Sequence, residues 1–457
     1  MISSTEPGQV SAPQAPADDP QSSVVTVNTG SDGYEPAGGA WRIAWRALWT
    51  SRLVILLGSV ISILQAGEGV PSTTPPGTLG FFRNLITLPY NRWDGAFYLA
   101  IAQHGYTGFS AFAPQTRMAF FPLYPCLVRL LGLAIGSFTF AGIIVSLAAF
   151  WISLVLLYRL VLLDFSAEVA ELTVMLTAFL PFAFFFSAIY TEATFLALSI
   201  GCVYAARLER WPLCGLLGLL AAATRNEGVF LLIPAVLIYC YGPRAAITAR
   251  RTRWSENREG FQRLLFRYRL SAQAAWLILI PLGAAGYLAY LQLRYHAGLE
   301  PLKAQQAYFA RTTTLPPIAL WDAGREFWGT VRALITGDGP DTAVIGQPFG
   351  PAQGSFQNLY ASISVLITGI ALAVSWRRIR FAYWFYILVI FLVALSDPNQ
   401  IGLPLEGFPR YEICYFPLFI WAADLAVRKQ WKLPLIGSSA CALGYFAALY
   451  ATGRFIF

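Results

Sequence analysis

Charged residues are scarce in this sequence. Asp, Glu, Lys and Arg make up 12% of its 457 residues, whereas 56% are hydrophobic. A soluble protein of this length needs far more charge on its surface, so the composition excludes a soluble globular chain and indicates several membrane spans. The formal net charge of +8 does not indicate a nucleic-acid partner, because the basic residues cluster in short segments between apolar stretches.

Histidines and paired cysteines are also nearly absent. His104 and His296 are the only histidines, and the six cysteines form no CxxC pair. The chain contains no glycine-rich phosphate loop, no GxSxG, no HExxH and no evident DxD pair. We therefore expect no metal site and no cofactor, and nucleotide-sugar chemistry gains no support.

Residues 1–39 are rich in Ser, Pro, Ala, Gly and Asp and contain no Lys or Arg. This composition cannot bury a core. We expect a disordered cytoplasmic tail here, followed by a single transmembrane domain over residues 40–457.

Apolar stretches follow one another along that domain and predict an all-α polytopic membrane protein with about eleven transmembrane helices, in a range of about ten to thirteen. The expected spans are 44–66, 139–161, 169–186, 188–206, 211–224, 228–242, 273–293, 356–375, 381–396, 411–427 and 433–452.

The basic clusters predict the orientation. Eight arginines lie in the loop 243–272, and further clusters lie at 377–380 and 428–432. With eleven spans and a cytoplasmic N-terminus, all of them fall on the cytoplasmic side, as the positive-inside rule requires. The external loops are then about 67–138, 294–355 and 397–410. We expect juxtamembrane helices in the first of them, because 120–136 carries prolines and an arginine that a lipid-facing span would not favour.

The first external loop contains the stretch "YNRWDGAFYLAIAQHGYTGF", residues 90–109. If it is helical from residue 93, Asp94 and Tyr98 share one face. Asp94 is then either a carboxylate at the mouth of a cavity between the spans or an ordinary surface or helix-capping residue.

Other polar residues lie at the outer ends of spans, where an ionised group is costly to desolvate. Tyr190 and Glu192 begin the fourth span, and Arg225 lies at the break between the fifth and sixth. Arg225 could equally form a structural ion pair with Glu192 or Glu227. The external cations that could bind a phosphate are Arg117, Lys303, Arg311 and Arg410, with Arg225 deeper.

Two segments of the first loop, "RWDGAFYLAIAQHGY" and "AFFPLYP", resemble the mannosyltransferase family typified by glycosylphosphatidylinositol mannosyltransferase II (PIG-V). "FFFSAIYTEATF", "TRNEG" and "RYEICYFPLF" are similar to later motifs of that family in the same order, so the resemblance covers residues 42–428. One departure is Asn226-Glu227, where the eukaryotic members usually read Ser-Asn.

The resemblance implies the GT-C glycosyltransferase fold and a hexosyltransferase that moves mannose, with inversion, from a polyprenyl-phosphate (dolichyl-phosphate-like) donor to a glycolipid or other membrane acceptor. It implies Asp94 as the catalytic base. It also implies a set of residues that bind the donor phosphate or the acceptor: His104, Tyr106, Arg117, Tyr190, Glu192, Arg225, Arg311, Arg410 and Tyr411. The short loops favour a bacterial plasma membrane, with the active site on the extracytoplasmic face.

Two other interpretations stay open. A transporter or flippase of lipid-linked sugars would need ionisable residues near span midpoints and a repeated half, whereas the polar residues here gather at outer ends. A non-catalytic subunit could keep the fold and partner another transferase, although the intact Asp94 argues against it. Nothing in the sequence indicates an oligomeric state.

Overall fold

The computed structural model of the protein describes residues 38–66, 78–108, 111–241, 271–336, 351–399 and 402–454. The expected tail 1–39 and the basic loop 243–272 therefore lie almost entirely outside the described residues. Residues from Ala40 onward form one compact unit. Within the described residues its regular secondary structure is helical, apart from one isolated β-bridge between Arg311 and Asn399, which confirms the predicted all-α class.

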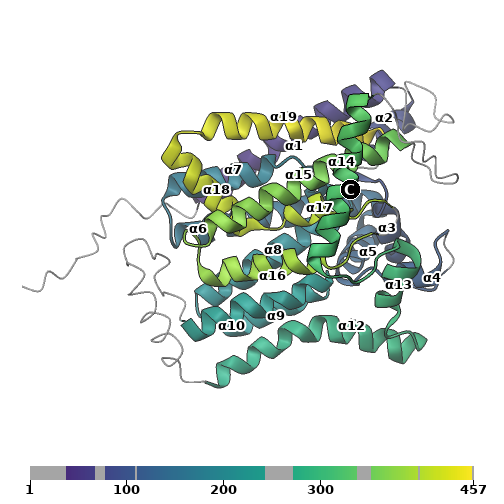
Figure 1. Ribbon diagram of the computed structural model, residues 1–457. Helices are drawn as coiled ribbons and strands as arrows, with labels where there is room; N and C mark the ends of the chain where they lie inside the picture. The colour runs from purple at the N-terminus through teal and green to yellow at the C-terminus, as the bar shows by residue number, and fades with distance from the viewer. Residues whose placement is uncertain are drawn as a thin grey trace, which may run out of the picture. The chain divides into compact units, whose positions relative to one another are not determined.

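Each of the eleven apolar ranges contains a helix, and most of these helices run side by side (Figure 1). The helices in those ranges are α1 (Gly38–Ala66), α6 (Phe138–Leu162), α7 (Ala167–Phe179), α8 (Glu192–Arg207), α9 (Trp211–Ala222), α10 (Leu232–Tyr241), α12 (Leu279–Tyr295), α15 (Pro351–Ser375), α16 (Phe381–Leu395), α18 (Phe416–Lys429) and α19 (Lys432–Ala451). Within the described ranges, five stretches are long and apolar enough to cross a membrane, so a multi-pass protein is supported and the count of eleven is not established.

The first external loop contains short helices, as predicted. They are α2 (Leu79–Thr87), η1 (Leu88–Tyr90), α3 (Gly95–His104), α4 (Pro114–Met118) and α5 (Leu123–Ile135). The second loop contributes α13 (Glu300–Phe309) and α14 (Pro316–Thr336), which the apolar pattern did not predict.

The expected span 169–186 is wrong at its C-terminal end. α7 stops at Phe179, and Leu180 adopts an extended conformation with φ −52° and ψ 145°. Pro181 explains the break, because proline disfavours a helical conformation in the residue before it and cannot donate a backbone hydrogen bond. The following segment forms only the short turn η2 (Ala183–Phe186), whose phenylalanines are completely buried.

Ion pairs join the helices at both ends of the bundle. At one end, Asp164 accepts two hydrogen bonds from Arg207 and two from Arg380, joining the ends of α6 and α8 to the start of α16. Lys432 pairs with Glu168 at the starts of α19 and α7. The opposite end holds the N-terminus of α8 and the C-termini of α9 and α16, and there the predicted site residues gather.

Candidate active site

Asp94 directly precedes α3, in the position where a side chain often caps a helix. Its side chain makes no capping hydrogen bond, so the interpretation of Asp94 as a helix cap is wrong. Trp93 just before it has a φ of 51°, in the left-handed region that a bulky residue seldom adopts. Tyr190 fixes this turn: its hydroxyl accepts the Asp94 N–H at 3.2 Å and donates to the Arg92 carbonyl at 3.1 Å.

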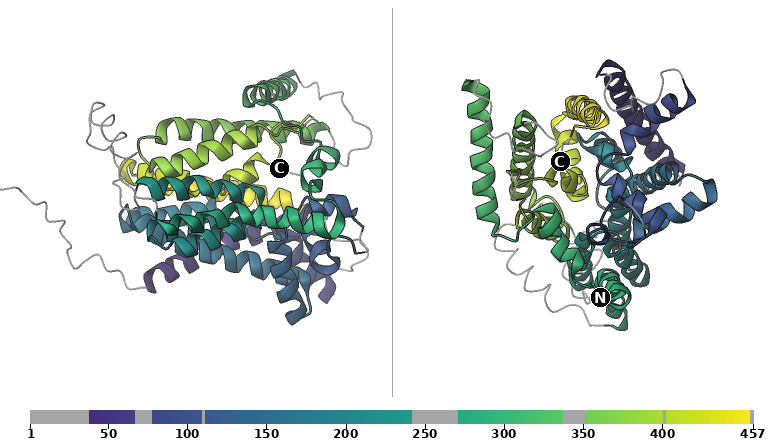
Figure 2. Two further views of the ribbon diagram at one scale, coloured as in Figure 1. Left: turned by 90° about the horizontal axis from the view of Figure 1, so that it is seen from below. Right: turned by 90° about the vertical axis from the view of Figure 1, so that its right-hand side faces the viewer.

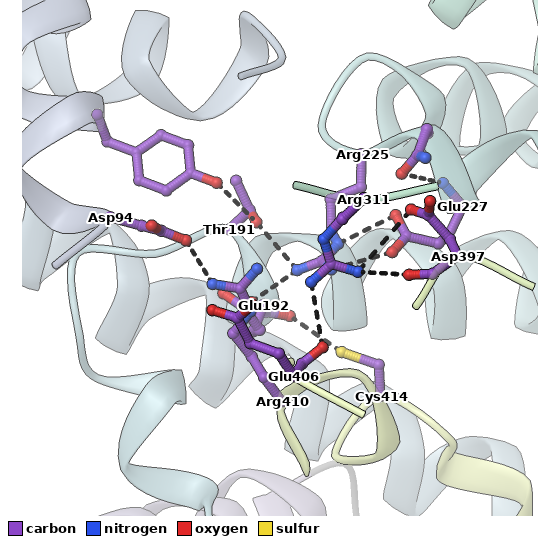
Figure 3. Close-up of polar contacts among 12 residues, drawn as sticks. Asp94, Thr191, Glu192, Arg225, Glu227, Arg311, Asp397, Glu406, Arg410 and Cys414 are labelled. Atoms are coloured by element: carbon purple, nitrogen blue, oxygen red, sulfur yellow. Dashed lines mark hydrogen bonds and ion pairs between the residues drawn. The ribbon is translucent and has the colours of Figure 1, made fainter. Parts of the chain in front are cut away.

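The Asp94 carboxylate instead meets Arg410, which lies 316 residues further along the chain. Arg410 Nη1 is 2.5 Å from Asp94 Oδ2, and its Nε is 3.2 Å from Glu192 Oε1. Arg410 belongs to the short helix α17 (Phe408–Glu412), which follows Gly407 with a φ of 82°. One guanidinium therefore joins two carboxylates from distant parts of the sequence (Figure 3).

Glu192 also binds Arg225. Arg225 Nη1 donates to Glu192 Oε1 at 2.6 Å, and its other nitrogens bind Glu227 at 3.0 and 3.3 Å. Both structural pairings considered for Arg225 are thus present. Glu192 is completely buried at the start of α8, and its Oε2 has no hydrogen-bond partner among the described residues. Arg225 reaches it from an extended residue between α9 and η3 (Asn226–Leu231).

Arg311 approaches the same place from the second external loop. The extended segment that begins at Arg311 pairs with residues 396–399, with N–H donors of Thr312 and Thr314 bound to the Pro398 and Ser396 carbonyls. The Arg311 guanidinium donates to the Glu406 carbonyl at 3.1 Å and to the Asp397 carbonyl at 3.2 Å.

The ring of Tyr411 lies among all three guanidiniums. The ring centroid is 5.3 Å from Arg225, 5.6 Å from Arg410 and 5.9 Å from Arg311, within the range of cation–π attraction. Three cations thus share one small region with several carboxylates, among them Asp94, Glu192, Glu227, Asp397 and Glu406 (Figure 3).

Burial and pairing shift the titration of these groups in opposite directions. Burial disfavours the charged form of Arg410, but Asp94 and Glu192 outweigh it and raise the pKa of Arg410 well above its ordinary value. Burial raises the pKa values of Glu406 and Asp397, and the nearby Arg311 only partly offsets that effect. The arginines are therefore permanently charged, and the carboxylates of Glu406 and Asp397 are easier to protonate than exposed ones.

Three predicted residues lie at the other end of α3. His104 is exposed at its last turn, about 15 Å from Asp94 at the rise of an α-helix. The buried Arg117 donates to the Gly105 and Gly108 carbonyls at 2.5 and 2.7 Å. Tyr106 donates to the Phe120 carbonyl at 2.8 Å. In the structure Arg117 and Tyr106 hold the loop after α3, and neither contacts the cluster around Arg410.

Sequence reasoning missed some members of the cluster. Thr191 Oγ1 accepts a hydrogen bond from Arg225 at 3.3 Å and lies 3.4 Å from the hydroxyl of Tyr98. The sequence placed Tyr98 on the same helix face as Asp94, but not among the candidate site residues. Asp397 and Glu406 lie in the predicted external loop 397–410, but their contacts with Arg311 depend on the fold.

This cluster contains the chemical groups that are needed to transfer a group from a phosphate ester to a hydroxyl. Arginines form strong, directional hydrogen bonds to phosphate oxygens, and a carboxylate can accept the proton of an attacking hydroxyl. In the described part of the chain, no group of three or more His, Cys, Asp or Glu side chains has a metal-binding arrangement.

The central part of the chain matches one known family model. Residues 70–290 match the family model described as mannosyltransferase (PIG-V). No curated protein matches the chain.

Among solved structures, the chain is similar to oligosaccharyltransferase AglB from Archaeoglobus fulgidus in complex with an inhibitory peptide and a dolichol-phosphate. The identity is 10% and the TM-score 0.39, over 91% of this chain and 56% of that one. A second structure of the Archaeoglobus fulgidus oligosaccharyltransferase, tethered with an acceptor peptide, gives 10% identity and a TM-score of 0.41 over 91% and 55%. The chain thus spans about half the length of these proteins, and a likeness this low carries no argument about its activity.

Proposed function

Residues 70–290 carry the mannosyltransferase (PIG-V) family pattern, and from this premise we propose that the protein is an inverting mannosyltransferase of GT-C type. It takes mannose from a polyprenyl-phosphate mannose donor and transfers it to a glycolipid or another acceptor at the membrane. Asp94 is the catalytic base. The proposed setting is a bacterial plasma membrane, with the tail 1–39 in the cytoplasm and residues 40–457 forming the catalytic membrane domain.

The observation that carries the proposal is the contact between Asp94 and Arg410. Asp94 precedes a helix without capping it, and it is held by Arg410, which also contacts the buried Glu192. Stability of the helix alone does not require this geometry. Desolvating such charges is expensive, and groups arranged in this way gather at functional sites.

The chemistry needs one base. Asp94 accepts the proton of the acceptor hydroxyl as its oxygen forms a bond to the anomeric carbon of mannose. The bond between that carbon and the phosphate oxygen breaks, and its electron pair leaves with the polyprenyl phosphate. No general acid is required, because the phosphate is already a good leaving group. Attack from the face opposite the phosphate converts a β-linked donor into an α-mannoside.

Arg410 serves as the phosphate ligand closest to the base. In the structure Arg410 is paired with Asp94, so an incoming phosphate competes for the same guanidinium. When the phosphate binds Arg410, the Asp94 carboxylate is released toward the acceptor hydroxyl. Donor binding thereby prepares the base for the transfer step.

The other arginines extend the phosphate site. Arg225 lies across Glu192 from Arg410, and Arg311 faces the same Tyr411 ring, so charge developing on the leaving phosphate meets fixed cations. The Oε2 of Glu192, which has no hydrogen-bond partner among the described residues, is available to a sugar hydroxyl. His104, Tyr106 and Arg117 belong to the acceptor side of the proposal, through the loop that Arg117 and Tyr106 hold.

The distribution of charge supports an outward-facing site. The ion pairs at Arg207, Arg380 and Lys432 lie at the end of the bundle opposite Asp94, and Arg380 and Lys432 belong to the basic clusters expected in the cytoplasm. The protein then binds its donor on the extracytoplasmic side of the membrane.

Purified protein in proteoliposomes tests the function. We expect transfer of labelled mannose from polyprenyl-phosphate mannose to a membrane lipid extract, and none from a nucleotide sugar. Translocation of the intact lipid-linked sugar with no new glycoside would instead establish the flippase alternative and refute the transferase.

A further inference from the structure

Helix α14 runs across the ends of α15 and α16 instead of alongside them (Figures 1 and 2). It packs against both of these helices, near the end of the bundle that holds Asp94. A helix that crosses the direction of the membrane spans at their ends lies parallel to the membrane plane. That direction and position agree with the headgroup layer of the bilayer.

The faces of α14 differ sharply. Ala319, Ala323 and Thr330 are buried and form its inner face. At 3.6 residues per turn, the opposite face is an arc of about 100° and extends about 25 Å along the helix. We call it the outer face of α14; its residues are Ile318, Trp321, Arg325, Trp328, Arg332 and Ile335, all exposed.

Large apolar side chains on the outer face are unusually exposed. Trp321 is 71% exposed, Trp328 66% and Ile335 78%. A soluble surface would seldom present such a patch. Tryptophans that alternate with arginines on one side of an amphipathic helix are typical of helices that lie in the membrane interface.

Positive and negative side chains lie on different sides of α14. Arg325 and Arg332 lie on the outer face, whereas Asp322 and Glu326 lie on the flank between the outer and inner faces. These four charged residues explain why α14, although 21 residues long, is not among the five candidate spans. No ion pair of Arg325 or Arg332 is found among the described residues, so the outer face carries two cations and no acid.

We propose that the outer face of α14 lies on the headgroup layer of the leaflet at the Asp94 end of the bundle. Trp321 and Trp328 are its interfacial anchors, and Arg325 and Arg332 bind the phosphates of anionic phospholipids. The proposal needs neither mannose nor the donor, so it can fail without affecting the proposed function.

The location of α14 gives this contact a consequence for the site. Thr314, two residues before α14, donates to the Ser396 carbonyl, and Arg311 lies in the same extended segment. A helix held at the membrane surface therefore fixes the end of the segment that brings Arg311 to Tyr411.

Depth-dependent quenching tests the contact in the full-length chain. The six cysteines are first replaced by alanine or serine, and a fluorescent probe is attached to Trp328→Cys, or to Glu326→Cys as the flank control. In phosphatidylcholine–phosphatidylglycerol vesicles, we expect lipids spin-labelled just below the headgroup to quench the Trp328→Cys probe more than lipids labelled deep in the chain. The Glu326→Cys probe should respond more to aqueous iodide.

The lipid specificity is tested with the charge variant Arg325→Gln/Arg332→Gln. Adding phosphatidylglycerol to phosphatidylcholine vesicles should shift the emission of the Trp328→Cys probe in the parent, and the shift should be lost in the double variant. Arg377→Gln/Arg378→Gln, at exposed cations outside α14, is the matched control and should keep the shift.

Two results would overturn the proposal. Equal iodide quenching of both probes would place the outer face in water. Shielding of the Trp328→Cys probe from iodide and lipid quenchers alike, increasing with the protein-to-lipid ratio, would mean that a second copy of the chain covers the face. Elution at the parent position in gel filtration confirms that each variant is folded.

Discussion

At the scale of single residues, Arg410 is the side chain that holds the candidate site together. It contacts Asp94 before α3 and Glu192 at the start of α8, two carboxylates from distant parts of the sequence. Its forked guanidinium suits this task, because it can donate to two acceptors at fixed angles. The same geometry suits a phosphate that displaces Asp94.

Arg410→Gln should reduce kcat/KM for the lipid-linked donor by about 10²-fold or more, the loss typical of removing one donor to a developing oxyanion. Arg410→Lys keeps the charge but not the fork, so it should restore only part of the activity. Steady-state transfer assays with varied donor give both values. Arg83→Gln, at an exposed arginine of α2, is the control and should transfer at the parent rate; equal loss in both variants would contradict the role of Arg410.

Glu406 gives a prediction on pH and stability. Burial raises its pKa, so the folded protein binds this proton more tightly than the unfolded chain. The stability that the protonated form contributes is present below the ordinary pKa and is lost as pH rises through the folded one. Glu406→Gln should therefore unfold at a higher temperature than the parent at neutral pH.

Unfolding temperatures in detergent between about pH 4 and pH 8 test this sign. The advantage of Glu406→Gln should shrink as the pH falls, whereas Glu326→Gln, at an exposed carboxylate, should follow the parent throughout. If the unfolding temperature of Glu406→Gln relative to the parent instead rises toward low pH, the charged form of Glu406 stabilises the fold.

At the scale of elements, the irregular segments between helices carry the site. Arg225 is extended between α9 and η3, Arg311 lies in an extended segment, and Glu192 follows the break that Pro181 makes after α7. Regular helices satisfy their own backbone groups and form the bundle, while the breaks bring charged side chains to its end.

The far end of the bundle offers an element-level test. Asp164→Asn leaves two buried guanidiniums without their carboxylate and should destabilise the fold by about 3–5 kcal/mol, the usual cost of breaking a buried ion pair. Because Asp164 lies opposite the site, kcat of the folded fraction should stay near the parent value.

Thermal unfolding and transfer assays on the same preparation separate these effects. Asp424→Asn, in the more exposed pair with Arg428, should cost less than about 1 kcal/mol. A normal unfolding temperature for Asp164→Asn would mean that the three helix ends are held by packing alone.

At the scale of the whole molecule, the sequence predicted the positions of the helices better than the tertiary contacts between them. Among the described residues, a helix lies in each of the eleven apolar ranges, and proline explains the early end of the helix in 169–186; the helices in 188–206 and 411–427 begin later than predicted, at Glu192 and Phe416. Hydropathy missed α14, whose mixed faces average to low hydropathy. The motifs singled out Asp94, Glu192, Arg225 and Arg410, but the contact between Asp94 and Arg410 joins residues 316 positions apart. Such a pairing is fixed by tertiary packing, which local patterns do not encode.

Orientation is a prediction for the whole chain. Gln103 is exposed at the Asp94 end of the bundle, and Arg377 is exposed near the start of α16, the end that holds Asp164. With the exposed cysteines replaced, a membrane-impermeant maleimide added to intact cells should label Gln103→Cys and spare Arg377→Cys until the cells are opened. The reverse pattern would place the site in the cytoplasm.

The most direct test of the central claim is transfer of labelled mannose from polyprenyl-phosphate mannose by the parent and by Asp94→Asn. Removing the general base should lower kcat by about 10²-fold or more while donor binding persists, because Arg410 is then free of its carboxylate partner. Near-parental kcat in a folded Asp94→Asn protein would contradict the account.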